Sequence, residues 1–251
     1  MDDGKLTTLT KHVTTHGTAV LEVVYTNDPK NVERIIKKYE EWLKEEKNKF
    51  VSLNLEYTRK SSYIRQGIAV VQLAMREHVL VYHYCRSERS QALLDFLQRK
   101  AVTFTSVDTR GDKTMLASAW IKISDEHHVD IQRQLCIKGG GERDSMGDLA
   151  AAIIDPSYKN MKKSFPKEKH QFWEWKPLSP LHLEYASKAG YVSYELYRRI
   201  LIIKHGLRHI HQQPMKEDSA HVRTKTRDLP AAGSAERETV VGKLQENGCL
   251  H

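Results

Sequence analysis

The sequence has few cysteines and no long apolar run. Its three cysteines, Cys85, Cys136 and Cys249, include no pair at C-x-x-C spacing, which predicts reduced thiols and argues against a disulfide framework or a zinc site. The longest apolar stretch, residues 67–75, is interrupted by Gln72 and is too short to span a bilayer. The first residues lack the apolar segment of a secretory signal. We therefore expect an intracellular protein, in the nucleus or the cytoplasm, with no membrane association.

The charge balance is basic, with a formal net charge of +8. An excess of cations is compatible with a polyanionic partner, although acidic and basic residues alternate along much of the chain. The densest basic stretch, residues 159–169, contains five lysines. This stretch is either a solvated surface or a surface that contacts phosphates, and its composition does not distinguish the two.

Runs of β-branched and aromatic residues predict strands, and apolar residues at helical spacing predict helices. We expect strands at 19–25, 50–57, 68–76, 78–84, 101–106 and 127–130. Helices are expected to begin at Asn27 or Asp28, over 87–98, near Asp112, over 149–154 and over 179–204. The short separation between strands 68–76 and 78–84 predicts a hairpin. Strands mixed with helices indicate an α/β domain with one mixed sheet.

The chain is long enough to form one substantial core with tails at both ends. We expect the domain to cover residues 18–205. Residues 1–17 are polar and rich in threonine, which predicts a flexible segment. Residues 206–251 are rich in polar and scattered charged residues, a composition typical of a disordered tail.

Three separated segments carry polar residues in a distinctive pattern. Asn54 and Glu56 alternate on one strand and so share a face. Asp112 lies at the entry of a helix, and Tyr185 precedes Ala189 by one helical turn. These segments resemble the three sequence blocks of the DEDDy 3'–5' exonucleases, closest to the Werner-type exonuclease domain. The run Trp-Glu-Trp-Lys-Pro-Leu-Ser over 173–179 resembles the approach to the third block of that family.

The resemblance implies a ribonuclease H-like (DnaQ-like exonuclease) fold, with a central sheet of about five strands flanked by helices. It also implies a catalytic site in which four acids bind two divalent cations. In this sequence Asn54 and Ala189 occupy two of the four acid positions, which leaves Glu56, Asp112 and Tyr185 as a remnant catalytic site. With Glu56 and Asp112 as the remaining metal ligands, no metal is expected to bind tightly, and Mg²⁺ or Mn²⁺ would serve if the site is active.

Other acids could replace the missing ligands only with favourable geometry. Asp108 and Glu184 are close in sequence to the second and third blocks. Glu184 neighbours Tyr185 and therefore points away from the side of the helix that would face the metals.

The resemblance further implies contacts to nucleic acid near the first block, where Tyr57, Arg59, Lys60 and Tyr63 could stack on bases or bind phosphates. We expect a catalytically impaired exonuclease-like protein that binds single-stranded nucleic acid or 3' ends, or that serves as a scaffold for a protein partner. The alternative is an active metal-dependent 3'–5' exonuclease with an atypical site. Either DNA or RNA fits this expectation.

Overall fold

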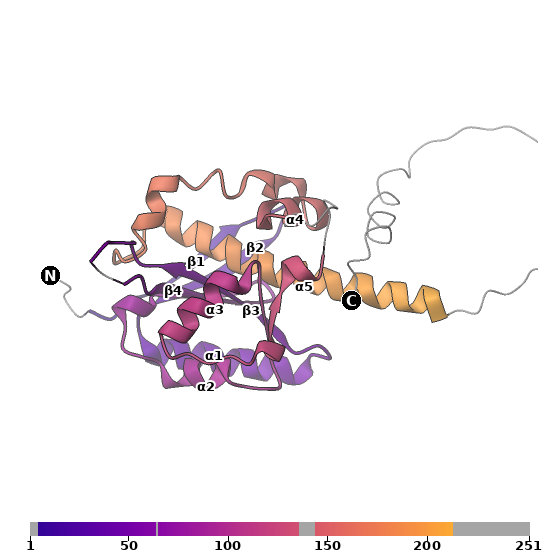
Figure 1. Cartoon of the computed structure of the whole chain (residues 1–251), viewed down its shortest axis with the longest axis horizontal. Coiled ribbons are helices and arrows are strands. Elements are labelled where there is room, and N and C mark those ends of the chain that lie inside the picture. Colours follow the sequence, from indigo (N-terminus) through magenta and orange to yellow (C-terminus); the bar gives the residue numbers. More distant parts are fainter. Residues whose placement is uncertain (1–4, 64, 136–143, 213–251) are drawn as a thin grey trace, which may run out of the picture.

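Seven strands form one mixed sheet in the order β1-β2-β5-β4-β3-β6-β7 (Figure 1). The computed structural model describes residues 5–63, 65–135 and 144–212. The strands are β1 (Thr8–Thr14), β2 (Val20–Thr26), β3 (Phe50–Tyr57), β4 (Ile68–Met75), β5 (His78–Tyr82), β6 (Thr103–Ser106) and β7 (His128–Asp130). Strand β3 pairs antiparallel with β4 and parallel with β6. The expected mixed α/β class is confirmed, and the sheet is larger than the expected five or so strands.

Helices cover both faces of this sheet. They are α1 (Pro29–Glu45), α2 (Gln91–Leu97), α3 (Thr109–Ser118), α4 (Met146–Ile153) and α5 (Pro180–Gln212), with short 3-10 helices η1 (Tyr84–Arg86), η2 (Asp125–His127), η3 (Ile131–Arg133), η4 (Pro156–Asn160) and η5 (Lys167–Gln171). Figure 1 shows α1 and α2 on one side of the sheet and α4 and α5 on the other. No helix within the described ranges is long and apolar enough to traverse a bilayer.

The N-terminal segment differs from the sequence-based expectation. Residues 1–17 were expected to be flexible, but Thr8–Thr14 forms β1 and pairs antiparallel with β2 along its whole length. The turn between the two strands is anchored far along the chain, because His16 Nδ1 lies 2.7 Å from the hydroxyl of Tyr158. Threonine favours strands, and backbone pairing holds this strand although most of its side chains are exposed. The expected tail covers 206–251, of which α5 extends to Gln212 and residues 213–251 lie outside the described part.

Local sequence signals explain several other elements. The Asp28 side chain accepts a hydrogen bond from the backbone of Lys30 and caps α1, the role that Asp commonly has at an N-cap. Strands β4 and β5 form the expected hairpin, with Met75 paired to His78. Its connection is therefore two residues long, and Arg76 adopts a left-handed conformation with φ 55°, as two-residue hairpins require.

Helix α5 packs very close to the middle of the sheet. A Cβ placed on Gly190 would meet side-chain atoms of Val79, Ala74 and Gln72 at 3.4–3.7 Å. The Ser52 hydroxyl on β3 donates a 2.8 Å hydrogen bond to the carbonyl of Gly190. The same helix joins two buried clusters, because its Val192, Leu196 and Ile200 pack with α4 and η4 rather than with the sheet. Together, the contacts of α5 with the sheet and with α4 determine which α5 residues face β3.

Candidate active site

Strand β3 carries the first pair of candidate residues on the face that meets α5. Asn54 pairs directly opposite Gln72 of β4, and Glu56 follows two residues later on the same face. Asn54 and Gln72 are buried, whereas Glu56 keeps some exposure. The expected strand and its shared face are confirmed. Gln72 was not recognised as a site residue, although a glutamine within an apolar strand was a detectable signal.

Asn54 is held by the helix that would supply the third block. The Ser193 hydroxyl donates a 3.0 Å hydrogen bond to Oδ1 of Asn54. Tyr185, Ala189 and Ser193 follow at four-residue intervals on α5 and so share one face. Ala189 is buried, and its methyl group brings no ligand to the site. The one side-chain oxygen of Asn54 therefore accepts a hydrogen bond from α5.

Asp112 lies in the first turn of α3, at the helix entry where the sequence places it. The hydroxyl of Tyr57 donates a 2.5 Å hydrogen bond to Oδ1 of Asp112. A Cβ on Gly111 would lie 3.4 Å from the Tyr57 hydroxyl oxygen, which is an ordinary contact, so this approach does not require glycine. The structure thus brings β3 and α3 together through a direct bond that the sequence did not predict.

Both remaining carboxyl groups are harder to ionise than usual. Burial raises the pKa of Glu56 to about 8, with a contribution from the charge of Asp112, while Gln72 and the ammonium of Lys162 oppose the increase. Water reaches part of Glu56 and limits the size of this effect. Burial raises the pKa of Asp112 to about 7, and the hydrogen bond from Tyr57 opposes it. Both groups therefore carry much less than full negative charge near neutral pH.

Several buried polar atoms near these carboxyls lack hydrogen-bond partners among the described residues. They are Nδ2 of Asn54 and both polar atoms of the Gln72 amide. Gln72 thus approaches Glu56 closely enough to influence its pKa, but without good hydrogen-bond geometry. An amide N–H repels a cation, so the unpartnered nitrogen of Asn54 does not complete a metal site.

The residues present do not fit a pair of divalent cations. Two Mg²⁺ or Mn²⁺ ions need several ionised oxygen ligands held together. Here the neutral Asn54 accepts a hydrogen bond from Ser193, and Asp112 accepts one from Tyr57. The side chain of Ala189 has no atom that could bind a metal. Within the part of the chain that the structure describes, no three or more His, Cys, Asp or Glu side chains form a group that could hold a metal ion.

The two acids considered as replacement ligands are engaged elsewhere. Oδ1 of Asp108 accepts a 2.9 Å hydrogen bond from Nε of Arg110, although its charge contributes to the raised pKa of Asp112. Glu184 is exposed and accepts a 2.5 Å hydrogen bond from Lys188, one helical turn away. Neither residue supplies a carboxylate between Glu56 and Asp112.

Tyr185 lies in an aromatic cluster that closes one side of the site. Its ring stacks on Phe165 at 4.4 Å between centroids and meets the edge of His170 at 5.6 Å. Burial, together with the charge of Glu56, raises the pKa of the Tyr185 hydroxyl above its usual range. Tyr185 is therefore a neutral phenol near Glu56.

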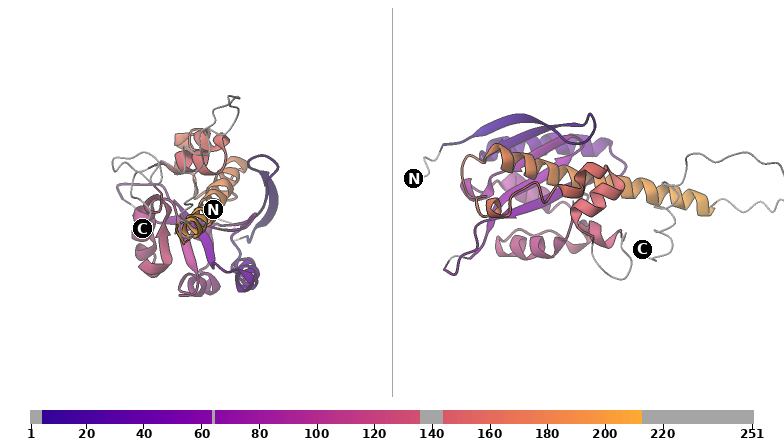
Figure 2. Two further views of the ribbon diagram at one scale, coloured as in Figure 1. Left: turned by 90° about the vertical axis from the view of Figure 1, so that its right-hand side faces the viewer. Right: turned by 90° about the horizontal axis from the view of Figure 1, so that it is seen from above.

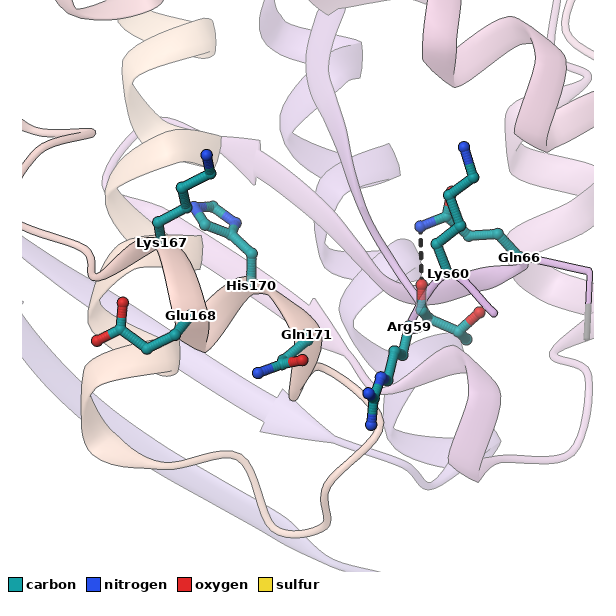
Figure 3. A pocket seen from close by; sticks show the side chains of 8 residues that line it. Arg59, Lys60, Gln66, Lys167, Glu168, His170 and Gln171 are labelled. Atoms are coloured by element: carbon teal, nitrogen blue, oxygen red, sulfur yellow. Dashed lines mark hydrogen bonds between the residues drawn. The ribbon is translucent and has the colours of Figure 1, made fainter. Parts of the chain in front are cut away.

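A pocket of about 520 Å³ opens beside this cluster, between the loop after β3 and helix η5 (Figure 3). One wall carries Arg59 and Lys60, and the other carries Lys167 and His170. Glu168 is the only acid that lines it. The pocket therefore has a positive balance and is open enough to accept an extended polyanion.

The four residues expected to contact nucleic acid separate into three groups. Arg59 and Lys60 line the pocket. Tyr57 does not, because its hydroxyl points to Asp112. Tyr63 is 95% exposed and lies outside the pocket lining. Lys167 comes from the basic stretch at 159–169, so part of that stretch faces the pocket.

No family model and no curated protein matches this sequence. Solved structures do resemble it. The EXO domain of Nibbler from Aedes aegypti superposes with a TM-score of 0.56 and 16% identity, over 74% of this chain and 88% of that domain. The chain has an exonuclease-domain fold.

Two further structures show the same exonuclease-like architecture. Escherichia coli RNase D, an exoribonuclease, gives a TM-score of 0.55 at 12% identity over 76% of this chain and 50% of its own. Trypanosoma brucei RNase D in complex with RNA U12 gives 0.54 at 13% identity, over 88% of this chain and 79% of its own. This chain thus spans only about half of the bacterial enzyme. The ribonuclease H-like fold implied by the sequence resemblance is confirmed.

Proposed function

We propose that this protein binds single-stranded nucleic acid through an exonuclease-like domain that has lost efficient phosphodiester hydrolysis. One observation carries the proposal: Tyr185, one helical turn before the neutral Ala189, contacts His170 in the lining of a pocket that also carries Arg59, Lys60 and Lys167. Loss of two acids weakens a site for paired metals, whereas it leaves a phosphate-binding surface intact. The similar RNase D of Trypanosoma brucei has been solved in complex with RNA U12, which favours RNA as the first probe.

Replacing the pocket cations should weaken binding of a labelled oligouridine. The variant is Arg59→Ala, Lys60→Ala, Lys167→Ala, measured by fluorescence anisotropy. We expect its affinity to fall at least about tenfold, and the salt slope to fall by about 2, because each phosphate contact to a single strand contributes about 0.7.

The matched control removes the same residue types from α1 on the opposite side of the sheet. Lys30, Arg34 and Lys37 are exposed there. Alanine at all three should change the affinity for the oligouridine less than about threefold, because salt screens charges that lie far from the bound strand. Equal losses in the two triple variants would show that binding depends on net charge and not on the pocket.

Hydrolysis is tested separately with the same strand labelled at its 5' end and supplied with Mg²⁺ or Mn²⁺. We expect the strand to remain intact while it binds. Progressive shortening from the 3' end that disappears in the Glu56→Gln, Asp112→Asn variant would contradict the proposed loss of hydrolysis and favour an active enzyme.

A further inference from the structure

Trp120 occupies a position that favours glycine. It follows the last turn of α3 with a left-handed φ of 59°, a conformation that is unfavourable for a bulky side chain. Its backbone N–H bonds to the carbonyl of Ala117, and the N–H of Ile121 bonds to the carbonyl of Leu116. This is the Schellman arrangement, in which the left-handed residue is usually glycine. The helix end therefore gains nothing from the indole ring.

The indole ring gains nothing from packing either, because Trp120 is 79% exposed. An exposed indole in a strained backbone position costs stability, and no packing inside the domain offsets that cost. Strain of this kind is typical of residues that contact a ligand. Trp120 is thus a candidate contact for a partner outside the chain.

A second exposed ring lies on the neighbouring loop. The guanidinium of Arg65 donates a 2.8 Å hydrogen bond to the hydroxyl of Ser118, which ties the loop after β3 to the end of α3. Tyr63 lies two residues before Arg65 and is 95% exposed, and Trp120 lies two residues after Ser118. Figure 2 shows this loop extending from the body of the domain. We call Tyr63, Arg65 and Trp120 the aromatic edge.

The aromatic edge continues the pocket. The loop that carries Tyr63 and Arg65 also supplies Arg59 and Lys60 to the pocket wall, and all charged residues in 58–66 are cations. Along α3, Asp112 and Trp120 are separated by about 12 Å at 1.5 Å per residue. A stacked strand advances about 3.4 Å per nucleotide and covers the length of α3 in about four nucleotides, so a strand that fills the pocket and also reaches Trp120 must be longer than that.

We propose that the aromatic edge stacks on unpaired bases of a strand whose phosphates lie in the pocket. This inference rests on the proposed nucleic-acid binding and extends it, because it assigns a second contact region and a minimum strand length. Aromatic side chains accept any base, since every base has a π-face. The contact therefore favours unpaired strands without selecting a sequence, and Arg65 adds a cation beside the rings.

The test compares oligouridines of about 4 and about 12 nucleotides with the full chain and with Trp120→Gly. Glycine suits the left-handed position, so this variant should fold at least as well as the wild type, which a melting curve checks. We expect it to bind the long strand roughly tenfold more weakly and the short strand unchanged. Trp120→Phe, which keeps an aromatic ring, should recover most of the lost affinity.

Tryptophan fluorescence provides a second readout. The difference between the wild type and Trp120→Gly isolates the emission of Trp120, which the long strand should quench and the short strand should not. Equal affinity of Trp120→Gly and wild type for the long strand would overturn the inference while leaving the pocket intact. If neither strand binds to the wild type, the proposed function fails and the inference fails with it.

Discussion

The melting temperature of the wild-type protein is expected not to change with Mn²⁺. The melting temperature of the Asn54→Asp, Ala189→Asp variant should rise when Mn²⁺ is added. The substitutions place two further carboxyl groups beside Glu56 and Asp112, whose pKa values are already raised. Without metal, the added like charges should destabilise the variant relative to the wild type. With metal, four acids can share the positive charge of the cations.

The size of this effect follows from ligand linkage. Metal at about 100 times its dissociation constant stabilises the folded state by about 2.7 kcal/mol, which raises the melting temperature of a domain of this size by roughly 5–10 °C. Differential scanning fluorimetry with and without Mn²⁺ measures the shift, and a chelator should reverse it.

The matched control is Ala189→Asn in the wild-type background, which adds nearly the same volume at α5 without a charge. This variant should show no response to Mn²⁺. A shift of several degrees in the wild type itself would mean that Glu56 and Asp112 suffice to bind the metal, and the account of a lost metal site would be wrong.

Unfolding free energy is expected to decrease between about pH 7 and about pH 9, by on the order of 1–2 kcal/mol. The folded protein retains the proton of Glu56 up to a pKa of about 8, whereas the unfolded carboxyl ionises near 4.5. The folded state therefore binds more protons across this window, and stability falls as the pH rises. Asp112, with a pKa raised to about 7, contributes in the same direction at the lower end of the window.

Buried histidines do not obscure this window. Burial lowers the pKa of His78 and of His128 to about 4, so these groups reduce stability as the pH falls below about 6.5. Above about pH 7 they are neutral in both states. Urea denaturation in steps from about pH 7 to about pH 9 thus isolates the carboxyl groups.

Glu56→Gln should remove most of this pH dependence and should be at least about 1 kcal/mol more stable than the wild type at about pH 9, since it removes a buried ionised group. Glu184→Gln, which changes an exposed glutamate of α5, should keep the wild-type profile. A wild-type stability that is constant or rises across the window would contradict the pKa assignments.

The sequence predicted the elements that have a clear hydrophobic pattern. Strand β3, the β4–β5 hairpin and helix α1 each bury an apolar face, and periodicity reports that face directly. Strand β1 was missed because nearly all its side chains are exposed. Only its pairing with β2 makes it a strand, and pairing between strands is not a property of one segment.

The strands and helices that carry the candidate residues were predictable, but the contacts between these residues were not. Alternation placed Asn54 and Glu56 on one face, and helical spacing placed Tyr185 and Ala189 together. The hydrogen bond from Ser193 to Asn54 joins positions 139 residues apart. Contacts between such distant positions depend on how α5 crosses the sheet. The second pocket wall, from η5, could not be predicted for the same reason.

The position of α5 at the end of the domain has a consequence for synthesis on the ribosome. The sheet face that carries Ser52, Asn54 and Gln72 stays uncovered until Pro180–Gln212 emerges, because that helix supplies its cover. Exposed strands of a nascent chain are prone to associate with other chains. The polar side chains of Ser52, Asn54 and Gln72 make this face less prone to such association before α5 covers it.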